Sequence, residues 1–102
     1  MRTFRLNGNT STRWFQMLGG DSVHVTCEGD FGGGNVNIEK RIFDTAYPVR
    51  DSAGDPLVYT AEFDVEIGLK PEALIRVTVD SATAPAIVGY INGQVEEVAV
   101  LS

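Results

Sequence analysis

The chain has 102 residues, of which 43% are hydrophobic and 22% are charged, so it is long enough for one globular domain with its own core. Fourteen acidic and eight scattered basic residues give a formal net charge of -6, which argues against binding to nucleic acid or to an anionic membrane surface. Cys27 is the single cysteine and excludes an internal disulfide, and residues 1–6 lack the apolar run of a secretory signal, so we expect synthesis in a reducing cytoplasm.

Short runs rich in β-forming residues follow one another along the chain, with turn residues about every ten positions. In the run 22–28, Val23, Val25 and Cys27 alternate with polar residues, as in a strand that buries one face. A strand that contains Pro48 can pair only at a sheet edge, because proline lacks the N–H donor. The first half is predicted to contain strands at 2–6, 13–18, 22–28, 35–42 and 47–50.

The second half continues the pattern, and no window of eleven residues has convincing helical periodicity. Ile75, Val77 and Val79 share one face of their run and indicate a half-buried strand. Asn92-Gly93 suits a type I′ turn, so we expect the runs on either side of it to pair as a hairpin. The strands predicted here are 57–60, 62–67, 74–80, 86–91 and 95–100.

These ten runs predict an all-β domain, for which we expect eight or nine short strands. That number is enough for a two-sheet antiparallel β-sandwich. Jelly-roll and immunoglobulin-like topologies are not separable by strand count. We expect a single domain over residues 1–102, with residues 1–20 forming either an N-terminal arm or the first strands.

Catalytic and metal-binding patterns are not found. His24, the single histidine, precedes Cys27 by three positions, and an odd separation on a strand places two side chains on opposite faces. We therefore expect Cys27 to be a core thiol and His24 to lie at the surface. The turn-rich stretches 29–34 and 51–55 lack the spacing of phosphate-binding and calcium loops. The chain is predicted to be no enzyme and to carry no metal or cofactor.

One run carries a stripe of carboxylates. Glu62, Asp64 and Glu66 share a strand face at a spacing of roughly 7 Å, which is typical of a solvated face but also suits a divalent cation or a basic partner. Arg76, flanked by apolar residues, is expected to reach across its sheet face to a carboxylate such as Asp64 or Glu66.

Aromatic side chains are the candidates for partner binding, because exposed aromatics contribute strongly to interfaces. Trp14 and Phe15 are adjacent on a predicted strand, so they point to opposite faces. One of them is expected at the surface or under a partner, or else beneath a loop that packs over the sandwich end. The partner-binding residues we predict are Trp14, Phe15, Tyr47, Tyr59 and Tyr90.

Two segments resemble small bacteriophage virion domains. Residues 29–38, GDFGGGNVNI, resemble the stretch G-x-F/W-G-G-x-x-V-x-L/I of those domains, and residues 74–83, LIRVTVDSAT, are similar to their x-x-R-V-x-V-x-G/S-A-T segment. The resemblance extends over roughly residues 20–92. It departs at residues 43–46, FDTA, where an Asp-Gly turn is usual.

The resemblance implies a non-enzymatic virion structural protein, made in the host cytoplasm and localised to the virion. The leading expectation is a capsid decoration (cement) protein that binds capsid subunits as a homotrimer. The resemblance also implies a related role, that of a fibre or tail-associated component. The alternative is a receptor- or carbohydrate-binding module of a tail or fibre, with Tyr47, Tyr59 and Trp14 near Asn35 and Asn37 as its platform.

Overall fold

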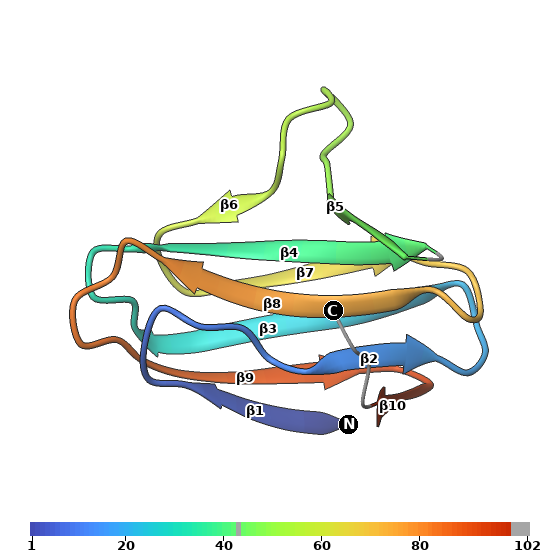
Figure 1. The fold of residues 1–102 in the computed structure, drawn as a ribbon, viewed down its shortest axis with the longest axis horizontal. Coiled ribbons are helices and arrows are strands. Elements are labelled where there is room, and N and C mark those ends of the chain that lie inside the picture. The colour runs from blue at the N-terminus through green and yellow to red at the C-terminus, as the bar shows by residue number, and fades with distance from the viewer. Residues whose placement is uncertain (43, 99–102) are drawn as a thin grey trace.

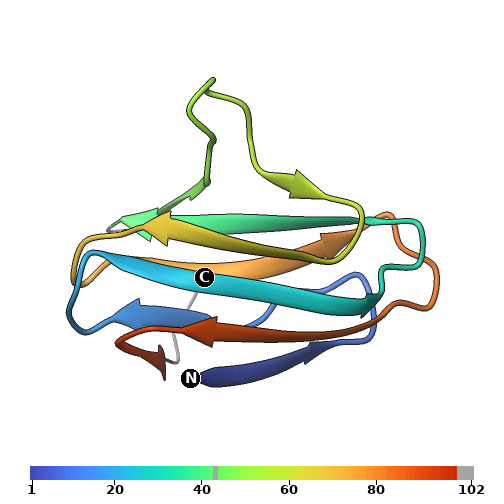
Figure 2. The same ribbon diagram turned by 180° about the vertical axis from the view of Figure 1, so that it is seen from behind.

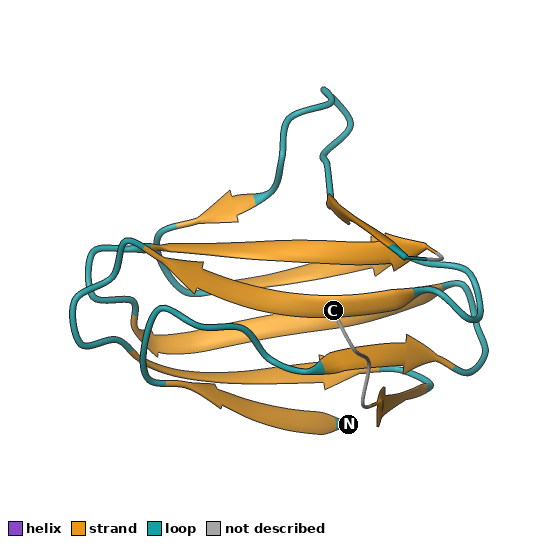
Figure 3. Cartoon of the chain, in the orientation of Figure 1, coloured by secondary structure: helices purple, strands orange, loops and turns teal. Residues whose placement is uncertain are grey.

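The computed structural model describes residues 1–42 and 44–98, which form ten β-strands joined by loops (Figure 3). The count exceeds the expected eight or nine, and one of the ten is only two residues long. No helix in the described part is long and apolar enough to cross a membrane. The strands are β1 (Arg2–Leu6), β2 (Trp14–Met17), β3 (Ser22–Asp30), β4 (Asn35–Ile42), β5 (Thr45–Pro48), β6 (Val58–Tyr59), β7 (Phe63–Gly68), β8 (Leu74–Asp80), β9 (Ala86–Asn92) and β10 (Val95–Val98).

The strands build two antiparallel sheets that face each other, which confirms the predicted two-sheet sandwich (Figures 1 and 2). The smaller sheet has the order β1-β9-β3-β7. The larger has the order β10-β2-β8-β4-β5, and β6 pairs with β4 as well. Within residues 1–20, β1 pairs with β9 of the smaller sheet and β2 with β8 and β10 of the larger.

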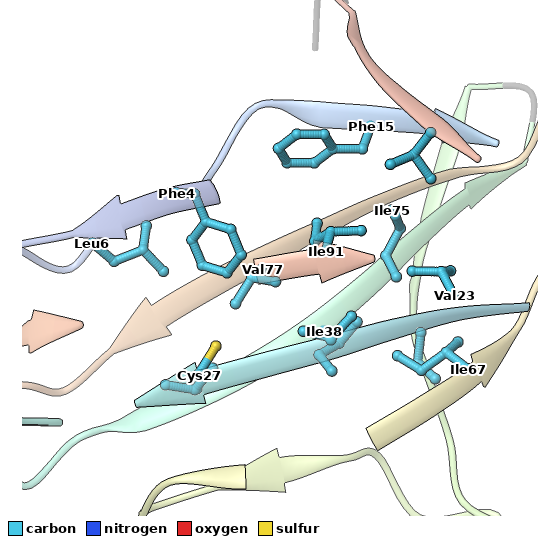
Figure 4. Close-up of a cluster of buried hydrophobic side chains, with 14 of the residues drawn as sticks. Phe4, Leu6, Phe15, Val23, Cys27, Ile38, Ile67, Ile75, Val77 and Ile91 are labelled. Atoms are coloured by element: carbon cyan, nitrogen blue, oxygen red, sulfur yellow. The ribbon is translucent and has the colours of Figure 1, made fainter. Parts of the chain in front are cut away.

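The core lies between the two sheets and follows the period-two pattern of the sequence (Figure 4). Val23, Val25 and Cys27 of β3 are buried, and Val25 faces Val65 on β7 and Ile91 on β9. Among the described residues, no polar or charged residue is buried. The fully buried side chains are Leu6, Met17, Val23, Val25, Cys27, Val36, Ile38, Ile75, Val77, Ile87 and Ile91.

A close approach of β1 to β9 requires a glycine. Phe4 pairs with Gly89 across the two strands, and a β-carbon at position 89 would overlap the Phe4 ring. The missing side chain of Gly89 therefore makes the space in which Phe4 packs into the core.

The predicted hairpin at Asn92-Gly93 is wrong. β9 pairs with β1 and β3, whereas β10 pairs with β2, so the chain crosses from the smaller sheet to the larger here. A type I′ turn needs positive φ at both central residues, but of the two only Gly93 has it. Residues 99 and 100 of the expected last strand lie outside the described residues.

The expected edge strand is confirmed, with shifted bounds. β5 lies at the edge of the larger sheet and ends at Pro48, which pairs with Glu39 of β4. The chain then leaves the sandwich in a loop that projects beyond both sheets before β6 (Figure 1).

Candidate functional site

An open cleft lies where two sheet edges face the same side of the sandwich. β5 is the edge of the larger sheet and β7 is the edge of the smaller one. Between them is a pocket of about 870 Å³, which we call the β5–β7 cleft. It is lined by residues of β4, β5 and β7, by Asp44 just before β5, and by the loop between β5 and β6.

The cleft has an apolar floor and a charged rim. Val49 and Ile67 are buried at its base, and Leu57 and Val65 are half-buried beside them. Ile42 is 46% exposed although it is apolar. Charged residues of both signs also line the cleft: Lys40, Asp44, Arg50, Asp51 and Glu66. An apolar surface framed by mixed charges is the usual anatomy of a protein-binding site.

The loop that forms one wall of the cleft is held by its own hydrogen bonds. Asp51 Oδ1 accepts from the backbone N–H of Ala53 at 2.9 Å and of Asp55 at 3.0 Å. Arg50 Nη1 donates to the Gly54 carbonyl at 2.8 Å. The Asp51 carboxylate thus serves turn formation, as the composition of residues 51–55 indicates. These hydrogen bonds define the shape of the loop where it lines the cleft.

Trp14 and Phe15 are both buried, which corrects the expectation that one of them is exposed. Phe15 points into the core. Trp14 lies outside that core cluster, with the Arg76 guanidinium 4.5 Å and the Arg41 guanidinium 5.9 Å from its ring centroid. Two arginine side chains from neighbouring strands therefore cover the indole ring.

The three predicted tyrosines lie in three different places. Tyr47 is 47% exposed and lines the β5–β7 cleft. Tyr59 stacks on Phe63 with centroids 3.7 Å apart, and burial, together with the Asp51 carboxylate, raises the pKa of its hydroxyl. Tyr90 donates from Oη to Glu28 Oε1 at 3.3 Å on the smaller sheet. Of the five predicted residues, only Tyr47 contributes to the cleft.

His24 and Cys27 point to opposite faces of β3, as their spacing predicts. Cys27 is buried in the core, and burial raises the pKa of its thiol to about 12. His24 is exposed, with Nε2 3.5 Å from Asp64 Oδ1. The pair cannot act as nucleophile and base, because a full strand thickness separates the two side chains.

The carboxylate stripe, with Glu62 just before β7 and Asp64 and Glu66 on it, is hydrogen-bonded to β3 rather than gathered around an ion. No group of three or more His, Cys, Asp or Glu side chains is placed to hold a metal within residues 1–42 and 44–98. Each of the three carboxylates instead accepts a hydrogen bond: Glu62 from Gly29 N at 3.0 Å, Asp64 from Thr26 Oγ1 at 3.1 Å, and Glu66 from Ser22 Oγ at 3.5 Å.

Arg76 pairs with Glu39 of the neighbouring strand β4, with Nε and Oε1 2.9 Å apart. The prediction that Arg76 pairs with Asp64 or Glu66 is wrong, because these two residues lie on β7 in the other sheet. The ion pair and the Trp14 ring together form a small polar-aromatic cluster on the larger sheet.

No protein-family model, curated protein or solved structure matches this chain. Sequence reasoning missed most of the cleft: Leu57 and Val65 are apolar residues in predicted strands and look like ordinary core positions. Only the strand order reveals that β5 and β7 are both edges, which leaves these side chains partly uncovered.

Proposed function

We propose that the chain is a non-enzymatic structural component of a virus particle, a capsid decoration protein that attaches to its protein partner through the β5–β7 cleft. The observation that carries the proposal is the cleft itself, with its apolar floor between two sheet edges. Ile42 and Tyr47 are exposed beside this floor, and apolar surface of this kind is costly to leave in water and is typical of a binding site.

The placement of the reactive side chains favours a binding role over catalysis. Cys27 faces the core with a raised pKa, and His24 lies on the outer face of the smaller sheet. Neither side chain lines the cleft. What the cleft offers a partner is apolar contact and charge, which hold a protein segment without transforming it.

The virion assignment is supported by the two segments that resemble bacteriophage virion domains. Residues 29–38 lead into β4, and residues 74–83 comprise β8 and the turn after it. β4 and β8 pair along most of their length, with Ile38 opposite Val77. Two segments far apart in the sequence thus form one structural unit in the larger sheet.

The resemblance also implies a homotrimer, which light scattering at micromolar concentration tests directly. A protein that stays monomeric would contradict the predicted trimer but not the proposal that the cleft is the attachment site. The carbohydrate-binding alternative remains a prediction, and three residues of its proposed platform are buried or hydrogen-bonded within the chain. Trp14 is buried, while Asn35 and Asn37 both donate to the Asp80 carboxylate, at 3.1 and 2.7 Å.

Purified virus particles from the source provide the decisive experiment. Mass spectrometry of gradient-purified particles is expected to find this chain at a constant ratio to the capsid subunit. Its absence from the particles would overturn the virion assignment.

The role of the cleft is tested by rebinding purified protein to particles grown without the gene. Ile42→Asp places a charge in the cleft, and Val58→Asp is the matched control because Val58 is 48% exposed but does not line the cleft. We expect Ile42→Asp to weaken co-sedimentation by about tenfold or more, and Val58→Asp to behave like the unchanged protein. Equal binding by both variants would exclude the cleft as the attachment site.

A further inference from the structure

β7 leaves one backbone edge without a partner strand in the described structure. It pairs only with β3, and the Leu69 N–H continues that ladder by donating to the Asp21 carbonyl at 3.0 Å. In an antiparallel ladder, alternate residues direct their backbone groups to opposite sides. Because the Leu69 N–H bonds to the β3 side, every second residue before it, including Val65, also bonds to β3. The residues between them, Asp64 and Glu66, direct their N–H and C=O groups outward.

β5, across the cleft, is protected against the same kind of pairing. The Val49 N–H donates to the Ile38 carbonyl at 2.9 Å, which fixes the alternation along β4 and β5. By that alternation Ala46 and Pro48 are the β5 residues that face outward, and proline has no N–H to donate. Of the two edges that border the cleft, β7 is therefore the one able to accept a new strand.

A strand added to β7 would place every second side chain beside the cleft. Val65 and Ile67 point to the inner face of the smaller sheet and line the cleft with Leu57. Side chains of the added strand that share this face would cover these apolar groups, so they must themselves be apolar.

The other face of the added strand would meet the carboxylate stripe. Asp64 and Glu66 are exposed on the outer face of β7 and form no contact with Lys or Arg closer than 4.0 Å in the described structure. Side chains opposite them are favoured when they carry positive charge. A second copy of β7 is disfavoured, because pairing would set carboxylates against carboxylates.

We propose that the occupant of the cleft is an extended segment of a partner protein that adds to β7 as a strand, with apolar side chains at every second position and Lys or Arg between them. The inference rests on the proposed function and specifies the chemistry of the partner. The length of β7 suits a segment of about six residues.

An NMR titration tests strand addition with a defined probe, a capped peptide of about eight alternating valine and lysine residues. We expect chemical-shift changes at the amides of Asp64 and Glu66 and intermolecular contacts along β7. A valine–glutamate peptide of the same length should bind at least about tenfold more weakly. Shifts located away from β7, or equal binding of the two peptides, would overturn the proposal.

Two variants at position 64 separate the contribution of the backbone N–H to binding from that of the side chain. Asp64→Pro removes the outward N–H and the carboxylate, whereas Asp64→Ala removes the carboxylate alone. The proline variant should bind the valine–lysine peptide more weakly than the alanine variant by about fivefold to tenfold, because one backbone hydrogen bond is lost. Equal binding by the two folded variants would exclude pairing at this edge.

N-methylated peptides test the same hydrogen bonds without any change to the protein. Methyl groups on all valine amides or on all lysine amides should affect binding very unequally, since only alternate residues of an added strand bond to β7. Equal affinity of the two methylated peptides would refute strand addition.

The outcomes also separate the inference from the proposed function. If Ile42→Asp prevents attachment to particles but Asp64→Pro attaches as well as Asp64→Ala, the strand addition is wrong and the cleft assignment stands. If the peptide adds to β7 but purified particles lack the chain, the virion assignment is wrong and the binding mode stands.

Discussion

The buried thiol of Cys27 makes the stability of this protein sensitive to alkaline pH. Burial raises the pKa of Cys27 from its ordinary value of 9.0 to about 12. Between these values the unfolded chain releases the thiol proton while the folded chain keeps it. The free energy of unfolding therefore falls as the pH rises above about 9, by up to about 1.4 kcal/mol per pH unit.

Near pH 10.5 the loss attributable to Cys27 amounts to about 2 kcal/mol, a large part of the stability of a small domain. Urea unfolding of the unchanged protein and of Cys27→Ala, at about pH 8 and about pH 10.5, isolates this contribution. Tyr59 also has a raised pKa, but its effect is present in both proteins and cancels in the difference. The unchanged protein should lose about 2 kcal/mol more than Cys27→Ala.

A difference below about 0.5 kcal/mol would refute the reasoning, because it would mean that the folded thiol ionises almost as easily as the unfolded one. Rapid alkylation of the native protein near neutral pH would lead to the same conclusion, since only an accessible thiolate reacts quickly. Either result would show that the thiol of Cys27 is less shielded from solvent than its place in the core indicates.

Two further substitutions test packing and charge. Gly89→Ala should lower the free energy of unfolding in urea by about 3 kcal/mol, because the added methyl group expels the Phe4 ring. The double variant with Phe4→Ala should lose little more than Phe4→Ala alone, and additive losses would contradict the contact. Arg76→Met should lower the free energy of unfolding by about 1–2 kcal/mol, because Glu39 loses its partner and Trp14 loses the nearer of its two cations. Trp14 is the chain's single tryptophan, so its emission spectrum should change in Arg76→Met and much less in Arg76→Lys, and unchanged spectra would contradict the stacking.

Much of the fold could be predicted because burial of one strand face is a local property. The alternation of Val23, Val25 and Cys27 depends only on the period of the strand, and the structure buries all three. The choice of partner strand is not local. Asn92-Gly93 indicates a turn, but whether β10 pairs with β9 or with β2 depends on residues from the other end of the chain.

The environment of Trp14 was unpredictable for the same reason. Its position on a strand shows that it points away from Phe15, but not that Arg76 and Arg41 lie over its ring. These arginines belong to β8 and β4, which reach the neighbourhood of β2 only through the order of the larger sheet. An aromatic residue that looks available for a partner is thus used within the chain.

Two features of the sequence nevertheless mark which edge is open. Pro48 removes a donor from β5, so this edge resists pairing with any strand. β7 has no proline and carries Asp64 and Glu66 on its outer face. If a partner strand adds to β7 as proposed, their charges would oppose the pairing of two identical β7 strands and favour a basic one, so the same residues would serve both purposes.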